Sequence, residues 1–375
     1  MKIDDALSIE DLRKIARKRA PRFIFDYIDG GAEDGIAMET NRQAFDRLRF
    51  RPKVLTGVQE RNTGTTILGR PSALPVIIGP IGLLGLSWRD GDIEMAKAAA
   101  AAGVPYGVST VSMNALEAIA NVSKGRLWFQ CYVFRERAIT EALVRRAAEA
   151  GYEGLIITCD FPVSGKRERD LRSGLVPDAA IRLSAKLEMI RHPRWLLNYL
   201  IHRPRFINVE RELEPGRDAG AFIARNMFDP SLDWDDFRRF RDQWKGKLLL
   251  KGVLRIDDAV RAVDEGADGI VLSNHGGRQL DAAISGMDIL PEVAHAIGKR
   301  ASIIVDGGVR RGSDIAKAIA CGAEAVILGR SINYGLAAGG AKGVAKAIDI
   351  LKDEFDRTLA LTGCRHVADL SPDLF

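Results

Sequence analysis

Short apolar runs recur along the chain and alternate with segments of helical periodicity. The eight runs occupy residues 74–80, 106–110, 126–133, 154–160, 247–253, 268–274, 302–308 and 325–330. The segments between them, such as 92–103, 136–151, 255–267 and 312–323, space their apolar residues as helices do and carry a glycine suited to a helix C-cap. Strands that alternate with helices predict a parallel sheet, and eight such units predict an α/β fold of the TIM (β/α)8 barrel type.

The chain of 375 residues is expected to form one barrel domain, preceded by a helical N-terminal segment. An open doubly wound sheet is the alternative fold, but the first strand is not followed by the G-x-G-x-x-G turn of dinucleotide-binding folds. The first 21 residues read as an amphipathic helix without an apolar leader, which favours a cytoplasmic protein. The longest apolar stretch, residues 73–86, is interrupted by Pro and Gly and is too short to span a bilayer.

A long insertion at residues 161–246 follows the fourth predicted strand, where a much shorter connection would serve. Its middle, about residues 177–215, combines apolar and aromatic residues around Trp195 and Tyr199 with Arg191, Arg194 and Arg203. This composition is typical of a basic amphipathic segment that contacts a membrane surface. Packing of the same apolar face on the barrel, or on another subunit, is the alternative.

Charge and cysteine content narrow the function only slightly. The net charge is +5 and the pI is about 9.0, which permits an anionic ligand or surface. Nucleic-acid binding is disfavoured, because zinc-finger spacings and aromatic-interleaved basic stripes are not found in the sequence. The four cysteines lie far apart without a C-x-x-C pair, so we expect buried, reduced thiols and no metal site.

Polar residues end nearly every predicted strand, at the edge of a barrel where active sites lie. They are Pro80, Ser109, Gln130, Tyr132, Thr158, Asp160, Lys251, Ser273, His275, Asp306, Gly307, Gly308, Gly329 and Arg330. Ordinary turns would account for one or two such residues. A set drawn from all eight strands predicts a functional site at this end of the barrel.

The last two strand ends predict a phosphate site, because barrels often bind phosphate after strands seven and eight. The sequence "DGGVRRG" (306–312) offers glycine N–H groups followed by Arg310 and Arg311, and "GRS" (329–331) adds Arg330. Two glycine-rich turns with solvated arginines are the structural alternative. Lys251, which ends the apolar run "LLLKGV", would be a costly buried charge unless it faces an anion in the barrel mouth.

The stretch "LSNHGGRQLD" (272–281) places His275 and Arg278 in one loop after a buried strand. A histidine can remove a proton near neutral pH, and an arginine can bind a carboxylate with two hydrogen bonds. The pair therefore suits proton abstraction from a hydroxy acid, and Asp306 on the next strand is predicted to hydrogen-bond the imidazole.

At these residues the sequence resembles the FMN-dependent L-2-hydroxy-acid dehydrogenase and oxidase family. The resemblance rests on "SNHGGRQLD" (273–281) and "DGGVRRGSDIAKA" (306–318), and extends from "DYIDGGAEDG" (26–35) through "WFQCYVFRER" (128–137) to "LTGCR" (361–365). It implies an FMN-binding TIM barrel, commonly a homotetramer, that oxidises an (S)-2-hydroxy acid to the 2-oxo acid. His275 would take the proton and the flavin the two electrons at N5, by a carbanion or a hydride route.

The resemblance also implies a role for each matching residue. The residues that match the catalytic and substrate positions are His275 with its partner Asp306, the carboxylate-binding Arg167 and Arg278, and the hydroxyl-bearing Tyr27 and Tyr132. Those that match the flavin ring and ribityl contacts are Lys251, Pro80, Ile81, Gly82, Ser109, Gln130, Thr158 and Ser273. Those that match the phosphate contacts are Gly307, Gly308, Arg310, Gly329 and Arg330.

Three departures from the glycolate oxidase pattern bear on substrate and electron acceptor. Ile81 stands where many members have Thr, Gly82 stands where glycolate oxidase has Ala, and Val111 stands where it has a bulky Trp. Together with the basic insertion, they make the chain look like the mandelate and lactate dehydrogenases that pass electrons to a membrane quinone or another acceptor. We expect peripheral contact with the inner face of the membrane. The alternatives are a soluble oxidase that uses O2, a phosphate-binding barrel without flavin, and a non-catalytic binder of membranes or nucleic acid.

Overall fold

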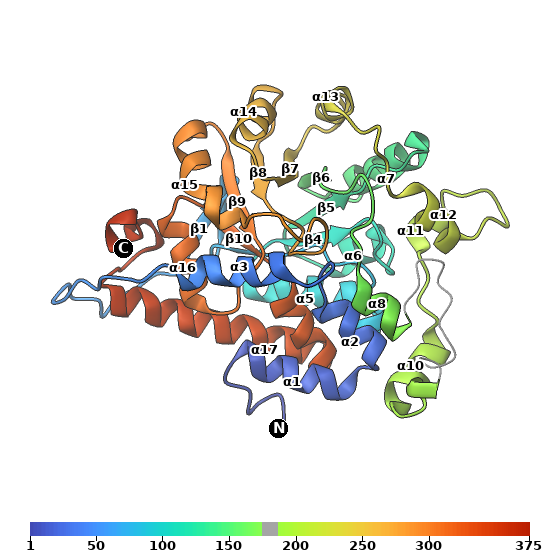
Figure 1. Ribbon diagram of the computed structural model, residues 1–375, viewed down its shortest axis with the longest axis horizontal. Helices are drawn as coiled ribbons and strands as arrows, with labels where there is room; N and C mark the ends of the chain where they lie inside the picture. Colours follow the sequence, from blue (N-terminus) through green and yellow to red (C-terminus); the bar gives the residue numbers. More distant parts are fainter. Residues whose placement is uncertain (175–186) are drawn as a thin grey trace.

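Eight short apolar segments form a closed parallel barrel in the computed structural model, which describes residues 1–174 and 187–375 (Figure 1). The strands are β3 (Val76–Ile78), β4 (Tyr106–Ser109), β5 (Leu127–Cys131), β6 (Gly154–Thr158), β7 (Lys247–Val253), β8 (Gly269–Leu272), β9 (Ser302–Asp306) and β10 (Ala325–Leu328). They pair in chain order, and β10 closes the barrel by pairing with β3. The prediction of a TIM barrel is confirmed, with each of the eight predicted runs forming one strand.

The barrel interior is filled by side chains that alternate along the strands with those facing the helices. Its interior cluster draws residues from seven of the strands, namely Ile77, Trp128, Ile156, Leu249, Val271, Ile304 and, both from β10, Ala325 and Ile327. A hairpin of β1 (Thr65–Ile67) and β2 (Arg70–Ser72) adds Ile67 and Leu68 to the same cluster. Because the interior is packed, a ligand site can form only at a mouth of the barrel.

Helices follow the strands and cover the outside of the barrel. They are α4 (Leu84–Ser87), α5 (Gly91–Ala102), α6 (Leu116–Val122), α7 (Arg137–Glu149), α13 (Trp234–Gln243), α14 (Ile256–Asp264), α15 (Gly286–Ile297), α16 (Gly312–Ala320) and α17 (Arg330–Thr362). The predicted glycine cap is present at the end of α5, where Gly103 has φ +67°. The long α17 is kinked at Gly339 and Gly340, and two 3-10 turns, Val367–Asp369 and Pro372–Leu374, end the chain.

The predicted helical N-terminus consists of α1 (Ile9–Arg19), α2 (Arg22–Asp29) and α3 (Ile36–Asp46). Helix α1 packs against α17, and α3 approaches the loops after β8 and β9. A Cβ on Gly308 would lie 2.2 Å from the backbone oxygen of Asn41 in α3, so that loop requires glycine there. The N-terminal segment thus forms part of the wall at the carboxyl end of the barrel.

The insertion after β6 projects from one side of the barrel (Figure 1). It contains α8 (Glu168–Ser173), α10 (Pro193–His202), α11 (Ile207–Glu210) and α12 (Ala219–Asn226), and part of the predicted membrane segment, residues 177–186, lies outside the described residues. Trp195 anchors α10 by donating a hydrogen bond to the Leu86 carbonyl (2.7 Å) and packing edge-on against Phe23. Leu197, Leu200 and Ile201 on the other face remain more than half exposed. In the described ranges 1–174 and 187–375, no helix has the length and apolar character needed to cross a bilayer.

Two expectations need refinement. Of the four cysteines, Cys131 and Cys364 are buried as expected, but Cys159 and Cys321 are half-buried, and all four are free thiols. Trp195 of α10 packs on the barrel, as the alternative of an apolar face docked on the barrel expected, while Leu197, Leu200 and Ile201 on the other face are exposed.

Candidate active site

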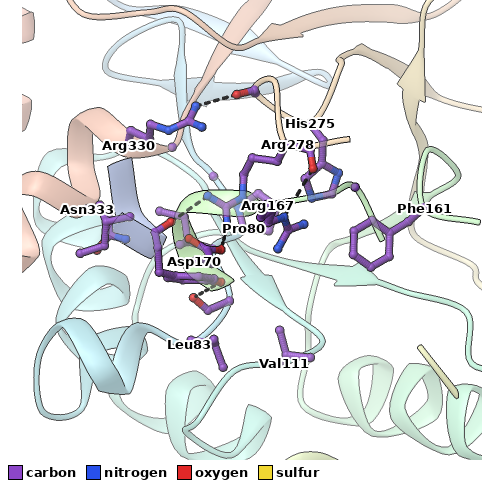
Figure 2. A pocket seen from close by; sticks show the side chains of 18 of the residues that line it. Pro80, Leu83, Val111, Phe161, Arg167, Asp170, His275, Arg278, Arg330 and Asn333 are labelled. Carbon is purple, nitrogen blue, oxygen red and sulfur yellow. Dashed lines mark hydrogen bonds and ion pairs between the residues drawn. The ribbon is translucent and has the colours of Figure 1, made fainter. Parts of the chain in front are cut away.

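One cavity of about 630 Å³ lies at the carboxyl ends of the strands and is lined by nearly all of the predicted site residues. Those that line it are Tyr27, Pro80, Ile81, Gly82, Gln130, Tyr132, Thr158, Arg167, Lys251, His275, Arg278, Asp306, Gly307, Gly308, Arg310, Gly329 and Arg330. Strand register accounts for part of this gathering, because Ser109 pairs with Gln130 and Thr158 pairs with Lys251. Figure 2 shows Arg167, Arg278 and His275 together, with Arg330 on one side and Phe161 on the other.

Two of the residues that match flavin contacts, Ser109 and Ser273, lie behind the cavity wall rather than in it. The Ser109 hydroxyl hydrogen-bonds the Gln130 side-chain oxygen (3.2 Å), and Gln130 in turn donates to the Thr158 hydroxyl (2.9 Å). The Ser273 hydroxyl accepts hydrogen bonds from Lys251 Nζ (2.8 Å) and from the His275 backbone N–H (3.0 Å). Both serines therefore hold cavity residues in position.

The loop after β8 is held in an unusual backbone conformation. His275, Gly276 and Gly277 have φ of +59°, +65° and +74°, so three successive residues are left-handed. Glycine adopts this conformation without strain, but histidine does so only where its surroundings hold it. Here the Ser273 hydroxyl binds the His275 N–H, and Asn274 pairs with Asn41 through hydrogen bonds of 2.8 and 2.9 Å. The loop thus fixes the imidazole at the mouth of the barrel.

His275 is hydrogen-bonded at both ring nitrogens. Its Nδ1 lies 3.0 Å from Asp160 Oδ1 and its Nε2 lies 3.1 Å from the Tyr132 hydroxyl. Burial raises the pKa of Asp160, but the charges of His275 and Lys251 outweigh it and the net shift is downward. An ionised carboxylate can only accept hydrogen bonds, so Nδ1 carries the proton and Nε2 is the free acceptor. Burial lowers the pKa of His275, although Asp160 opposes that shift, which keeps Nε2 unprotonated near neutral pH.

The prediction that Asp306 is the partner of His275 is wrong. The Asp306 carboxylate lies 3.1 Å from the Lys251 ammonium, and Asp160 occupies the position beside His275. Burial lowers the pKa of Lys251, but the negative charges of Asp306 and Asp160 more than reverse this shift, so the ammonium stays charged. A buried ammonium requires a counter-charge, and Asp306 supplies it from the end of β9.

Two arginines converge on one side of the imidazole. Arg278 Nη1 donates to the backbone oxygens of Tyr27 (2.7 Å) and Gly30 (3.0 Å), and its guanidinium lies over the Tyr27 ring at 4.8 Å. Arg278 Nη2 is buried without a hydrogen bond in the described structure. Burial and the neighbouring Arg278 charge lower the pKa of Arg167 to about 10. Two incompletely neutralised, half-buried guanidinium groups that line one cavity form a binding site for an anion such as a carboxylate.

A second cationic region surrounds Arg330. Its guanidinium donates to the backbone oxygens of Gly276 (2.7 Å) and Gly30 (2.6 Å), while its Nε is buried without a partner among the described residues. Burial and the charges of Arg278 and Arg310 lower the pKa of Arg330 to about 9. Arg330 is also the first residue of α17, whose N-terminal N–H groups favour an anion.

Glycines complete this cationic region. Gly307 and Gly308 have φ of +89° and +82°, and a Cβ on Gly329 would meet no atom within 4 Å. Arg311, which also belongs to the predicted phosphate loop, pairs instead with Glu354 (3.1 Å) and does not line the cavity. The arrangement suits a phosphate held by Arg310, Arg330 and backbone N–H groups.

Sequence reasoning missed the aromatic residues beside His275. The Phe161 ring stacks on Tyr132 (4.6 Å between ring centres), on His275 (5.2 Å) and on Phe228 (4.6 Å). Phe161 directly follows Asp160, so its place after β6 was the only signal in the sequence. Asp170 in α8, 3.8 Å from Arg278, is a further cavity residue that had no recognisable pattern.

The presence of glycine at position 82 has a local structural reason. A Cβ on Gly82 would lie 2.6 Å from Val111 Cγ2 and 3.4 Å from the Tyr27 hydroxyl, which donates to the Gly82 carbonyl (3.2 Å). An alanine at position 82 would therefore collide with Val111, so the space beside Val111 depends on glycine at position 82. Both residues line the same cavity as His275.

Comparisons with known proteins agree with this geometry. The family described as FMN-dependent dehydrogenase matches residues 16–375. The chain is 43% identical to an (S)-mandelate dehydrogenase of Pseudomonas putida over 98% of this chain and 93% of that protein. It is 45% identical to a putative L-lactate dehydrogenase of Mycobacterium tuberculosis (98% and 88% covered) and 39% identical to an L-lactate oxidase of a Nostoc species (98% and 97% covered). The crystal structure of monotopic membrane protein (S)-mandelate dehydrogenase superposes with a TM-score of 0.94 at 42% identity and 99% coverage of both chains.

Proposed function

Because this chain belongs to the FMN-dependent dehydrogenase family, we propose that it oxidises an (S)-2-hydroxy acid of the mandelate type to the 2-oxo acid and passes the electrons to a membrane quinone or a similar acceptor. The observation that carries this proposal is a half-buried His275, paired with Asp160 at Nδ1, that lies beside Arg167 and Arg278 in one cavity. The 1–375 chain acts as a single barrel domain in this proposal.

The cavity residues fit FMN. Three residues that line the cavity carry buried polar atoms without a protein partner among the described residues, namely Arg330 Nε, Asp306 Oδ1 and Asn333 Oδ1. Arg310 and Arg330 would hold the phosphate, while Gln130, Thr158 and Lys251 would contact the ring and ribityl chain. FMN, when bound, supplies the capacity to accept two electrons, and the Lys251 ammonium favours an electron-rich ring.

His275 acts as the general base. Its unprotonated Nε2 takes a proton from the hydroxy acid, and the Asp160 carboxylate at Nδ1 stabilises the imidazolium that results. Tyr132, which donates to Nε2 in this structure, is placed to pass its hydrogen bond to the substrate hydroxyl when the acid binds. Burial raises the pKa of Tyr132, so it remains a hydrogen-bond donor at neutral pH.

Arg167 and Arg278 bind the substrate carboxylate, and Tyr27 supports this site from α2. The Tyr27 ring lies under the Arg278 guanidinium, and burial raises the pKa of its hydroxyl, which keeps that hydroxyl protonated. Binding the carboxylate at these cations orients the carbon that bears the hydroxyl toward His275.

An aromatic acid is favoured over lactate by the walls around His275. Phe161, Val111 and Leu83 line the cavity and are uncharged. Gly82 leaves room that an alanine would remove by contacting Val111. These features agree with the 43% identity to an (S)-mandelate dehydrogenase.

The exposed face of α10 supports contact with a membrane surface. Leu197 and Ile201 are 59% and 61% exposed, and Arg191, Arg194 and Arg203 beside them are also exposed. Apolar side chains bordered by arginines suit insertion at an anionic lipid interface. The similarity to a protein described as a monotopic membrane protein agrees with this proposal. We further propose a homotetramer, as the family resemblance implies.

Anaerobic titration of the purified protein tests this function. (S)-Mandelate should bleach the flavin band quickly, L-lactate slowly, and air should restore the band slowly. His275→Gln should retain FMN but bleach about 10²- to 10⁴-fold more slowly, which is the usual contribution of a general base. The absence of bleaching by both acids would refute the proposal. Bleaching by lactate with rapid recovery in air would identify a 2-hydroxy-acid oxidase, the second candidate, which the Nostoc relative favours.

A further inference from the structure

The cavity extends well beyond the residues that suit a hydroxy acid and FMN. One wall comes from α12, where Gly220, Ile223, Ala224 and Met227 all line it. Ile223, Ala224 and Met227 follow Gly220 by three, four and seven residues, so the four lie on one face of α12, with Met227 just after its last residue. This apolar wall is longer than a small hydroxy acid could contact.

Further apolar lining of the same cavity comes from α10 and α4. Trp195 and Tyr199 line it, and their rings stack at 5.2 Å with an angle of 11°. Leu86 lines it as well and accepts the Trp195 hydrogen bond at its carbonyl oxygen. None of the residues from α4, α10 and α12 that line the cavity is charged, so we call this region the apolar arm.

The apolar arm lies on the inner side of the same helix whose outer side is exposed and apolar. Trp195 and Tyr199 are half-buried and face the arm, whereas Leu197, Leu200 and Ile201 are exposed. A water-soluble acid gains little from such a route. A molecule with an apolar chain, dissolved in lipid against α10, could enter the arm while keeping its chain out of water.

We propose that the apolar arm is the binding site of the electron acceptor, a lipophilic quinone that enters beside α10 and directs its ring toward the His275 end of the cavity. This inference rests on the proposed function and names the place of its second substrate. In the net reaction the hydroxy acid loses two electrons and two protons to become the 2-oxo acid. The quinone gains two electrons and two protons to become the quinol.

The fluorescence of Trp195 can report binding in the apolar arm, because this tryptophan, one of five in the chain, lines the arm. The FMN-loaded enzyme is titrated with a benzoquinone that carries a decyl chain, and the fluorescence lost in wild type but not in Trp195→Phe is assigned to Trp195. We expect saturable quenching. The same benzoquinone without the chain should bind at least about 10-fold more weakly, since each buried methylene contributes about 0.8 kcal/mol.

Two matched variants locate the quinone. Ala224→Phe fills the arm and should abolish the saturable quenching, whereas Ala221→Phe, on the same helix but outside the cavity lining, should retain it. Leu86→Phe narrows the arm from α4 and replaces Ala224→Phe if that variant does not take up FMN. Equal quenching in the Ala224 and Ala221 variants would overturn the proposal, as would quenching that does not saturate.

Flavin bleaching separates this inference from the proposed function. If Ala224→Phe slows bleaching by mandelate more than it weakens quinone quenching, the arm holds the side chain of the hydroxy acid, and the quinone site is refuted. If wild type is not bleached by a hydroxy acid, the proposed function fails. Bleaching of wild type without saturable quenching of Trp195 refutes only the quinone site.

Discussion

The Nδ1 atom of His275 lies 3.0 Å from the Asp160 carboxylate, which leaves Nε2 as the acceptor that faces Tyr132. Asp160 follows β6 and His275 follows β8, so the barrel brings together two residues that are 115 positions apart. The ionised Asp160 fixes the tautomer and stabilises positive charge on the ring. The base therefore depends on a carboxylate from a different strand end.

Asp160→Asn should slow flavin bleaching by about 10²- to 10⁴-fold, because the imidazolium loses its counter-charge and an amide, which can donate to Nδ1 as well as accept from it, no longer fixes the tautomer. The rate is measured by anaerobic stopped-flow absorbance. Asp306→Asn serves as the comparison, since Asp306 contacts Lys251 rather than His275. The inflection of the pH profile should move to lower pH in Asp160→Asn and stay in place in Asp306→Asn. A shift in Asp306→Asn alone would restore Asp306 as the partner of His275.

The rate of flavin bleaching should fall at acid pH, with its midpoint below about 6.5, the ordinary pKa of histidine. Burial lowers the pKa of His275, so its neutral, active form persists below that pH and the inflection lies on the acid side. This inflection is measured by plotting, against pH, the bleaching rate at low substrate divided by the concentration of the hydroxy acid, because that ratio reports the free enzyme. An inflection above 6.5 that is absent from His275→Gln would contradict the assigned direction.

Arg330→Met should weaken FMN binding by about 10- to 100-fold and leave riboflavin binding nearly unchanged. The reason is that a hydrogen bond to a charged group contributes about 1.5–3 kcal/mol and riboflavin has no phosphate. Equilibrium titration of apoprotein with each flavin measures both affinities. Arg311→Met is the matched control and should bind FMN as wild type does, because Arg311 pairs with Glu354 outside the cavity. Equal losses for FMN and riboflavin would mean that Arg330 does not contact the phosphate.

Phe161→Leu should slow flavin bleaching by about 2- to 10-fold, since an aromatic contact contributes about 0.5–1.5 kcal/mol and this ring packs on His275. The rate at saturating acid should change more than the half-saturating acid concentration, because the ring positions the base. Phe228 stacks on Phe161 but is not paired with His275 among the described ring pairs. Phe228→Leu should therefore slow bleaching less than Phe161→Leu does. If Phe161→Leu changes the half-saturating acid concentration more than the rate at saturating acid, Phe161 contacts the substrate and does not position the base.

Replacing Leu197, Leu200 and Ile201 by serine should reduce co-sedimentation with vesicles of anionic lipid by at least about 10-fold, because the exposed apolar side chains that α10 would insert into the lipid are lost. Leu361→Ser is the matched control, since Leu361 is 73% exposed but lies in α17. Flavin absorbance and circular dichroism check that each variant is folded. Unchanged sedimentation would assign the exposed face of α10 to contacts between subunits.

The sequence by itself determined the fold and most of the residues around the cavity. Apolar runs and helical segments repeat with local periods, and glycines such as Gly103 end helices by a local backbone preference. Because parallel strands present their carboxyl ends at one mouth, a list of strand-end residues already contained His275, Lys251 and Arg330. These features depend on neighbours along the chain, which a sequence displays directly.

Tertiary structure alone decided which charged groups pair across the barrel. Asp160 and Asp306 both end strands, and only their positions in space assign the first to His275 and the second to Lys251. The same holds for Phe161 on His275 and for the split of α10 into an anchored side and an exposed side. Electrostatic pairing and ring stacking act over a few ångströms between residues far apart in sequence, so they follow from the closed barrel and not from any local pattern.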